Sequence, residues 1–264
     1  MKLAFSTLGC PRWTMTDIVT TAKDLGFNGV EIRGLREEMY APNIKDFSKD
    51  KIEATKAMFG KNFSICMLTS SCCIADYSQK DSVLNEAFDY INLAQQLGVK
   101  YVRIMCTNKA SKDGGDYTLA VKNYKAILDY AKNTSVTPLI ETNGMFVESA
   151  LLKKFVEEVG GNAGVLWDIH HPYRFGGESI DTTLANIGKY IKYCHIKDSV
   201  VENGETQYKM LGYGDIPVKY AVLKLKELGF DGFITLEWVK RWNKNLEEPG
   251  IVFSHYIDYI KRLI

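Results

Sequence analysis

The sequence predicts an α/β protein built as a (β/α)8 TIM barrel, in a single domain over residues 1–264. Eight short β-rich segments alternate with amphipathic helical segments along the 264 residues, and several of the helical segments end in Leu-Gly. Strict alternation of strands and helices is typical of parallel strands joined by right-handed crossovers. Eight such units in about 250 residues favour a closed barrel over an open sheet.

The eight predicted strands are rich in Val, Ile, Phe, Tyr and Thr, which are the residue types that strands favour. They cover residues 3–7, 29–33, 63–69, 101–107, 137–142, 164–169, 191–196 and 232–238. No Gly-x-Gly-x-x-Gly turn follows the first of them, which counts against a dinucleotide-binding sheet.

Helical periodicity occupies the segments between the predicted strands. Apolar residues recur at helical spacing in residues 16–25, 82–97, 118–131 and 217–228. Three of these segments are followed by a glycine, at Gly26, Gly98 and Gly229. A glycine just past the last apolar position suits a left-handed helix cap before the next strand.

Composition and charge narrow the class of protein. The residues are 46% hydrophobic and 25% charged, and 33 basic side chains balance 32 acidic ones for a net charge of +1. These values are typical of a soluble globular protein and give no reason to expect a nucleic-acid partner. Because the chain shows neither a signal peptide nor an apolar run of about 18 residues, we expect no membrane partner and a cytoplasmic protein with reduced cysteines.

Candidate reactive residues lie at the carboxyl ends of predicted strands, where barrel enzymes place their chemistry. They are Glu141, Asp168, His195 and Glu237. The first two intervals between them are both 27 residues, about one strand–helix unit, and the third is 42 residues with an extra glycine-rich loop. Each unit therefore delivers one potential ligand to the same ring of strand ends.

This set of side chains predicts a metal site. Three carboxylates around one opening would repel one another, and a divalent cation removes that conflict. Three oxygen donors and one imidazole suit a single Mn2+, Mg2+, Co2+ or Zn2+ ion, and the ligand types alone do not choose among these metals. A lone Asp or Glu at a strand end is more often a solvated residue or a helix cap, so the prediction depends on all four together.

Several short motifs connect the chain to a known group of proteins. They are residues 26–31, Glu141, Asp168-Ile-His-His171, His195-Ile-Lys-Asp198, residues 211–215 and residues 229–237. In this order they resemble the sugar phosphate isomerase/epimerase superfamily, the xylose isomerase-like barrels that include ketose 3-epimerases, hydroxypyruvate isomerases, inosose dehydratases and endonuclease IV. The resemblance covers essentially the whole chain.

The resemblance implies a metal-dependent isomerase or epimerase. Glu141, Asp168, His195 and Glu237 would be the metal ligands, and His171 would contact a substrate oxygen. The reaction would be proton transfer through an enediolate on a keto sugar or a related small carbohydrate, with the metal as Lewis acid. Glu141 and Glu237 come from non-adjacent strands, so one could remove a carbon-bound proton while the other returns it.

Other residues could complete a substrate pocket. Lys197, like His171, could donate a hydrogen bond to a neighbouring oxygen. Trp13 and Trp238 are candidates to lie against the apolar face of a sugar, although core packing is equally expected. Arg103 should pair with a carboxylate, because an unpaired buried charge is costly. Glu31 could bind a sugar hydroxyl or serve barrel packing alone.

Alternative functions stay open at this point. Ketose 3-epimerases carry a Glu and an Arg where this chain has Val147 and Val201, which weakens that particular assignment. A lyase or dehydratase of the same fold, acting on an inosose or a 3-keto sugar, is the first alternative, and a non-catalytic barrel subunit is the second. With only four histidines, the chain cannot build the trinuclear site of endonuclease IV. A homo-oligomer is compatible with the sequence.

Overall fold

The computed structural model describes residues 1–60, 62–112 and 114–264. Its parallel strands form a closed barrel in the order β1-β10-β7-β6-β5-β4-β3-β2, and β8 and β9 form a separate two-stranded sheet. The predicted fold class is therefore confirmed. The chain divides into two compact units, unit 1 with Met1–Cys66 and Cys194–Ile264 and unit 2 with Met67–Tyr193. The expectation of one domain over 1–264 stays a prediction.

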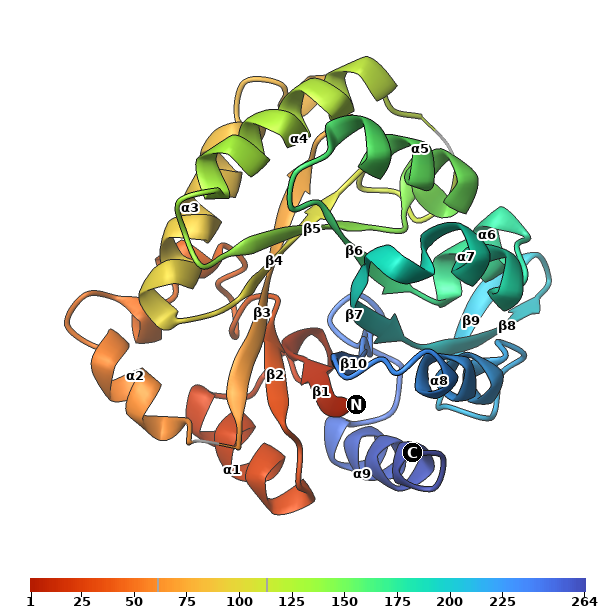
Figure 1. The fold of residues 1–264 in the computed structure, drawn as a ribbon. Coiled ribbons are helices and arrows are strands. Elements are labelled where there is room, and N and C mark those ends of the chain that lie inside the picture. The colour runs from red at the N-terminus through yellow and green to blue at the C-terminus, as the bar shows by residue number, and fades with distance from the viewer. Residues whose placement is uncertain (61, 113) are drawn as a thin grey trace. The chain divides into compact units, whose positions relative to one another are not determined.

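The observed elements follow the predicted alternation (Figure 1). The barrel strands are β1 (Lys2–Ser6), β2 (Gly29–Ile32), β3 (Ser64–Cys73), β4 (Tyr101–Met105), β5 (Thr137–Glu141), β6 (Gly164–Asp168), β7 (Ile191–Ile196) and β10 (Phe233–Leu236). The helices are α1 (Met15–Leu25), α2 (Ile52–Met58), α3 (Val83–Leu97), α4 (Tyr117–Ala131), α5 (Ser149–Val159), α6 (His170–Gly176), α7 (Ile180–Ile187), α8 (Val218–Glu227) and α9 (Pro249–Lys261).

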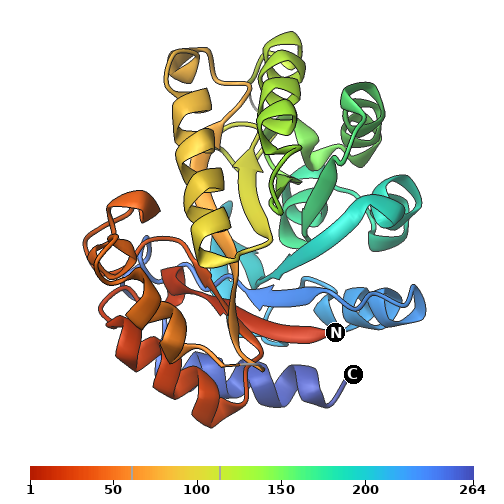
Figure 2. The same cartoon turned by 60° about the vertical axis from the view of Figure 1, so that its left-hand side comes forward.

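Unit 1 is organised around β1. In the parallel ladders, Phe5 pairs with Leu236 of β10 on one side and with Val30 of β2 on the other. The Phe5 ring stacks on Phe253 of α9 with ring centroids 4.2 Å apart. Figure 2 shows α9 beside α1, with which it is in contact, so the first and last helices cover the same strands.

Unit 2 repeats this arrangement with β4, β5 and β6. Parallel registers such as Ile104 with Ile140 and Ile140 with Val165 join the three strands. In Figure 2, α3 and α4 run side by side along the outside of this sheet. The buried Tyr124 of α4 donates a hydrogen bond to Pro138 O at 2.9 Å, and its ring lies against Phe155 of α5. These contacts hold the helices on the strands that carry the candidate residues.

The predicted helix caps are present in both units. Gly26 and Gly98 adopt left-handed φ angles of 76° and 71° and close α1 and α3. Both N–H groups donate to carbonyls of the preceding helical turn. A side chain at a positive φ costs free energy, which explains the glycine at the helix-to-strand junction.

The prediction of a glycine-rich loop after β7 is wrong in one respect, because this segment contains an antiparallel hairpin. The hairpin consists of β8 (Asp198–Glu202) and β9 (Glu205–Lys209). Asn203 and Gly204 connect them with φ angles of 53° and 80°. An Asn-Gly pair with positive φ at both positions is the favoured two-residue hairpin turn, so the signal was present in the sequence.

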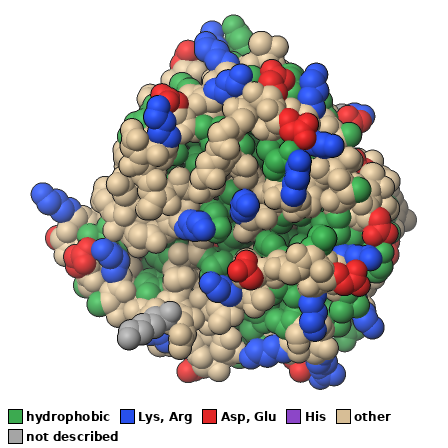
Figure 3. Space-filling view, in the orientation of Figure 1, with side chains coloured by type: hydrophobic (Ala, Val, Ile, Leu, Met, Phe, Trp, Pro, Cys, Tyr) green, Lys and Arg blue, Asp and Glu red, His purple; other side chains and the backbone are tan. Residues whose placement is uncertain are grey.

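The surface carries both signs of charge. Figure 3 shows Lys and Arg side chains interspersed with Asp and Glu on the face it presents, in agreement with the net charge of +1. Within the described ranges, every helix is either too short or too polar to cross a bilayer.

Candidate functional site

Glu141 ends β5 in unit 2 and is buried at 1% exposure. Arg103 of β4 donates from Nη1 to Glu141 Oε2 at 3.2 Å, and from Nη2 to Ser70 O at 3.0 Å. The expectation that Arg103 pairs with a carboxylate is confirmed. The ion pair compensates the buried charge of Glu141 and holds one edge of its carboxylate in a fixed direction.

Asp168 ends β6 in the same unit and is fully buried. Its N–H donates to Thr142 Oγ1 at 2.9 Å, and its carboxylate Oδ1 accepts the N–H of His170 at 3.0 Å. His171 Nε2 lies 3.4 Å from Asp168 Oδ2. The structure therefore brings Asp168 and His171 together, because β6 ends directly at the first turn of α6.

His195 of β7 is fully buried in unit 1 and faces a carboxylate at each ring nitrogen. Its Nε2 lies 2.6 Å from Glu31 Oε2 at the end of β2, and its Nδ1 lies 3.5 Å from Glu237 Oε1. With the ring proton on Nε2, this nitrogen donates to Glu31 Oε2. Nδ1 of the neutral ring then turns a lone pair toward Glu237, and either a second proton or a bound cation relieves the resulting repulsion.

Glu237 follows the last residue of β10 and is also buried in unit 1. Its N–H donates to Ile196 O at 3.1 Å, which fixes the backbone beside β7. The ammonium of Lys197 forms an ion pair with Glu237 Oε2. The structure thus brings Lys197, His195 and Glu237 together, with the two oxygens of Glu237 facing different partners.

The two candidate tryptophans differ in their surroundings. Trp13 is half-buried and lines a cavity together with Arg12 and Lys240. Trp238 is buried and donates from Nε1 to Glu247 O at 3.1 Å. Trp13 therefore has access to a ligand in that cavity, whereas Trp238 is positioned to support the loop after β10.

Sequence reasoning missed the roles of two carboxylates. Glu31, for which the sequence leaves a sugar-hydroxyl contact and barrel packing equally open, contacts His195. Asp198 accepts backbone N–H groups at 2.8 to 3.1 Å from Ser199, Gly212, Gly214 and Ile216. Burial raises the pKa of Asp198 while these hydrogen bonds lower it. The available signal for Asp198 was the glycine-rich segment 211–215, whose N–H groups need an acceptor.

The chain is similar in sequence to a curated protein and in fold to solved structures. Over 280 residues the chain is 21% identical to "Fructoselysine 3-epimerase" of Escherichia coli O157:H7, covering 100% of this chain and 98% of that protein. The structure of "IOLI protein with a binding zinc atom" matches with a TM-score of 0.82 at 19% identity, covering 100% and 99% of the two chains.

A dehydratase shares the fold as well. The structure of the probable 3-DHS dehydratase AsbF, involved in petrobactin synthesis in Bacillus anthracis, matches with a TM-score of 0.79 at 17% identity, covering 99% of both chains. The family model described as "Xylose isomerase-like TIM barrel" matches residues 19–256. The chain therefore belongs to the xylose isomerase-like TIM barrel family.

Proposed function

We propose that the protein is a divalent-metal-dependent sugar isomerase or epimerase that moves a proton beside the carbonyl of a keto sugar or a related small carbohydrate. The observation that carries this proposal is the environment of His195 in unit 1. Metal-binding histidines almost always donate their second ring N–H to a carboxylate or carbonyl, and His195 Nε2 lies 2.6 Å from Glu31 Oε2. The Nδ1 atom faces the carboxylate of Glu237, a second candidate ligand.

The metal ligands we propose are Glu141, Asp168, His195 and Glu237. All four are buried, and each offers one oxygen or nitrogen donor. The strands that carry them are consecutive in the barrel order, as β10-β7-β6-β5. Three carboxylates and one imidazole suit Mn2+, with Mg2+, Co2+ or Zn2+ as alternatives. When bound, the ion would stabilise the negative charge that develops on substrate oxygens during enolisation.

The protein's own side chains would carry the protons. We assign Glu141 and Glu237 as the pair that removes and returns the carbon-bound proton. Arg103 orients Glu141 through Oε2, and Lys197 orients Glu237 through Oε2, so each carboxylate is held by one cation. His171, beside Asp168, would donate a hydrogen bond to a substrate hydroxyl. The six cysteines are buried thiols, in keeping with the proposed cytoplasmic location.

Proton NMR in D2O with a panel of keto sugars, with and without Mn2+, tests this function. Epimerisation or isomerisation should keep the molecular formula and exchange deuterium at the reacting carbon. The Glu237→Gln variant should lose about 10²–10⁴-fold in kcat, because it removes a proton carrier. Glu227→Gln, which removes an exposed carboxylate in the same unit, is the matched control and should keep full activity.

A dehydratase acting on an inosose or a 3-keto sugar is the second candidate. Its support is the substitution of two polar epimerase positions by valine, with Val147 fully buried and Val201 exposed on β8. The same spectra distinguish the two reactions, because elimination forms an unsaturated product and releases water. Full turnover by Glu237→Gln, or no reaction with any metal and substrate, would contradict the proton-transfer assignment and favour a non-catalytic barrel.

A further inference from the structure

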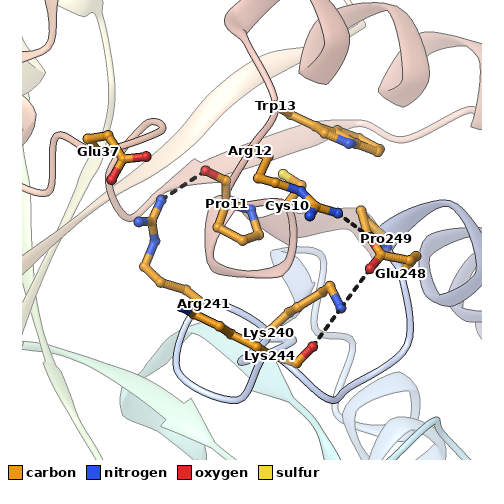
Figure 4. Close-up of a pocket in the computed structure, with 10 residues that line it drawn as sticks. All are labelled: Cys10, Pro11, Arg12, Trp13, Glu37, Lys240, Arg241, Lys244, Glu248 and Pro249. Atoms are coloured by element: carbon orange, nitrogen blue, oxygen red, sulfur yellow. Dashed lines mark hydrogen bonds and ion pairs between the residues drawn. The ribbon is translucent and has the colours of Figure 1, made fainter.

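A cavity of about 360 Å³ opens in unit 1 among the loops that follow β1, β2 and β10 (Figure 4). It is lined by Cys10, Pro11, Arg12, Trp13, Glu37, Lys240, Arg241, Lys244, Glu248 and Pro249. Its volume lies at the lower end of the range for small-molecule sites, which is about 300–1,000 Å³. None of these lining residues is a proposed metal ligand.

The cavity lies close to the proposed chemistry along the chain. Lys240 follows Glu237 by three positions in the segment after β10. Three extended residues span at most about 11 Å, so the two α-carbons are no farther apart than that. The spacing places the backbone of this cavity wall within about 11 Å of the backbone at Glu237, where the reacting carbons of the substrate would lie.

The lining is predominantly cationic. Four basic and two acidic side chains line the cavity, for a formal charge of +2. Glu248 is shared by two cations, with Arg12 Nη2 at 3.1 Å and Lys240 Nζ at 3.0 Å. The hydrogen bond from Lys240 lowers the pKa of Glu248, so this carboxylate stays ionised near neutral pH. Glu248 offsets only part of the charge of Arg12 and Lys240, so the lining of the cavity keeps a net positive charge.

Arg241 adds a donor that the protein leaves unsatisfied. Its Nη2 donates to Arg36 O at 2.7 Å, which holds the guanidinium at the cavity wall. Its Nε is buried and has no hydrogen-bond partner among the described residues. A buried donor without a partner costs free energy, and an oxygen anion bound in the cavity is the kind of group that removes this cost.

Trp13 supplies an apolar wall to the same cavity. Its ring packs edge-on against Phe253 with centroids 5.6 Å apart, so its orientation is fixed by the core. Figure 4 shows Trp13 on one side of the cavity and Arg241 on the opposite side. An apolar surface opposite a cationic one suits a ligand with a carbon chain and an anionic end.

We infer that this cavity binds an anionic group, a carboxylate or a phosphate, at the end of the substrate remote from the reacting carbons. The inference rests on the proposed function for the identity of the substrate as a keto sugar derivative. Arg12 and Arg241 would bind the anion, and Trp13 would contact the carbon chain leading to it. The Lys240 ammonium is directed at Lys244 O, Leu246 O and Glu248, so Lys240 would contribute positive charge rather than a direct contact.

Kinetics with matched substrates test the inference. A neutral ketohexose, its 6-phosphate and the corresponding hexulosonic acid share the keto-sugar unit and differ in the terminal group. We expect a KM at least about fivefold lower for one or both anionic compounds than for the neutral sugar. The anionic substrate with the lower KM identifies whether the cavity binds a phosphate or a carboxylate.

Arg12→Gln is the variant that isolates the cavity, because Arg12 is exposed and forms its ion pair with Glu248, another residue of the lining. It should raise KM for the preferred anionic substrate about three- to tenfold, and leave kcat and the KM for the neutral sugar unchanged. Arg262→Gln is the matched control, since Arg262 is a similarly exposed arginine in one ion pair outside the cavity. It should change neither constant. Equal KM values for neutral and anionic sugars, or identical behaviour of the two variants, would overturn the inference while the proposed function stands.

Calorimetry at low salt keeps the test decisive if no sugar is turned over. Inorganic phosphate and succinate are titrated into EDTA-treated protein, so that bound metal makes no contribution. Binding by the wild type and by Arg262→Gln, with at least about threefold weaker binding by Arg12→Gln, would support an anion site independently of the reaction. If turnover and anion binding are both absent, or if Arg12→Gln binds both anions like the wild type, the anion site is disproved.

Discussion

At the scale of single residues, one contact decides the chemistry open to His195. The side chain sits between two carboxylates of unit 1, and Glu31 Oε1 has no hydrogen-bond partner among the described residues, whereas Oε2 accepts from His195. The carboxylate of Glu31 therefore serves to orient the imidazole ring of His195. The tautomer it enforces leaves Nδ1 available to a cation, which a hydrogen bond from Nδ1 would prevent.

Glu31→Gln should weaken metal binding about 10–100-fold, because an amide oriented by its NH2 group no longer enforces the Nε2–H tautomer. Equilibrium titration with Mn2+, followed by the electron paramagnetic resonance signal of the free ion, measures this directly. Glu53→Gln, which alters an exposed carboxylate of α2, is the control and should bind Mn2+ like the wild type. Unchanged Mn2+ affinity in Glu31→Gln would show that Glu31 does not position His195 for a metal.

At the scale of elements, the hairpin β8–β9 and the following loop depend on Asp198. Four backbone N–H groups converge on its carboxylate, two of them from Gly212 and Gly214. At Gly214 the approach is so close that a Cβ would lie 2.6 Å from Ser199 O and would overlap the Asp198 carboxylate. Glycine is required there by contact with the carboxylate, since only a hydrogen atom fits.

Gly214→Ala should therefore lower the free energy of unfolding by about 1–3 kcal/mol, the range for forcing a methyl group into a packed site. Gly250→Ala in α9 is the control, because a Cβ there meets no atom within 4 Å. Urea denaturation of both variants measures the difference. Equal stability of the two would mean that the loop adjusts freely around Asp198.

The first helix offers a pH-dependent prediction. Thr14 and Asp17 form a reciprocal capping box at the start of α1, and the hydrogen bonds from Thr14 lower the pKa of Asp17 below its usual 3.8. A carboxyl with a lowered pKa in the folded state contributes stability above its unfolded pKa and loses it as the pH falls through the folded value.

Thr14→Ala should lower Tm by about 2–4 °C at pH 7 and by clearly less in acid, once the pH has fallen through the lowered folded pKa of Asp17 and its carboxyl is protonated in the wild type as well. Thr20→Ala, which removes an exposed hydroxyl bonded to Thr16 O within the same helix, is the control. Its effect should not depend on pH. Thermal unfolding at the two pH values provides the comparison, and a Thr14→Ala effect of equal size at both would refute the capping contribution of Asp17.

At the scale of the whole molecule, metal binding should be linked to folding. An ion that binds only the folded chain stabilises it by about 2.7 kcal/mol at a free concentration 100 times its Kd. Mn2+ should therefore raise Tm by roughly 5–10 °C, and EDTA should reverse the shift. Asp168→Asn, which removes one proposed ligand charge, should show a much smaller shift, and an equal shift in this variant would exclude Asp168 from the metal site.

Much of the fold was predictable because its signals are local. Strand runs, apolar periodicity and the glycines at 26 and 98 are read within one helix or strand, and each predicted barrel strand overlaps an observed one. The ends of the strands were predicted less accurately than their positions. The predicted third strand stops at residue 69, whereas β3 extends to Cys73, with a register shift after Thr69. The candidate ligands could be named from the sequence because they occupy strand ends in a repeating unit, and their role as ligands stays a prediction.

By itself, the sequence determined the class of barrel, the positions of its eight barrel strands along the chain and the family to which the chain belongs. Only the tertiary structure decided which side chain faces which: Glu31 meets His195 across 164 residues, and Arg103 meets Glu141 across 38. The physical reason is that backbone hydrogen bonding and amphipathic spacing act over a few residues. The pairing of buried charges, in contrast, depends on which strands the closed sheet makes neighbours.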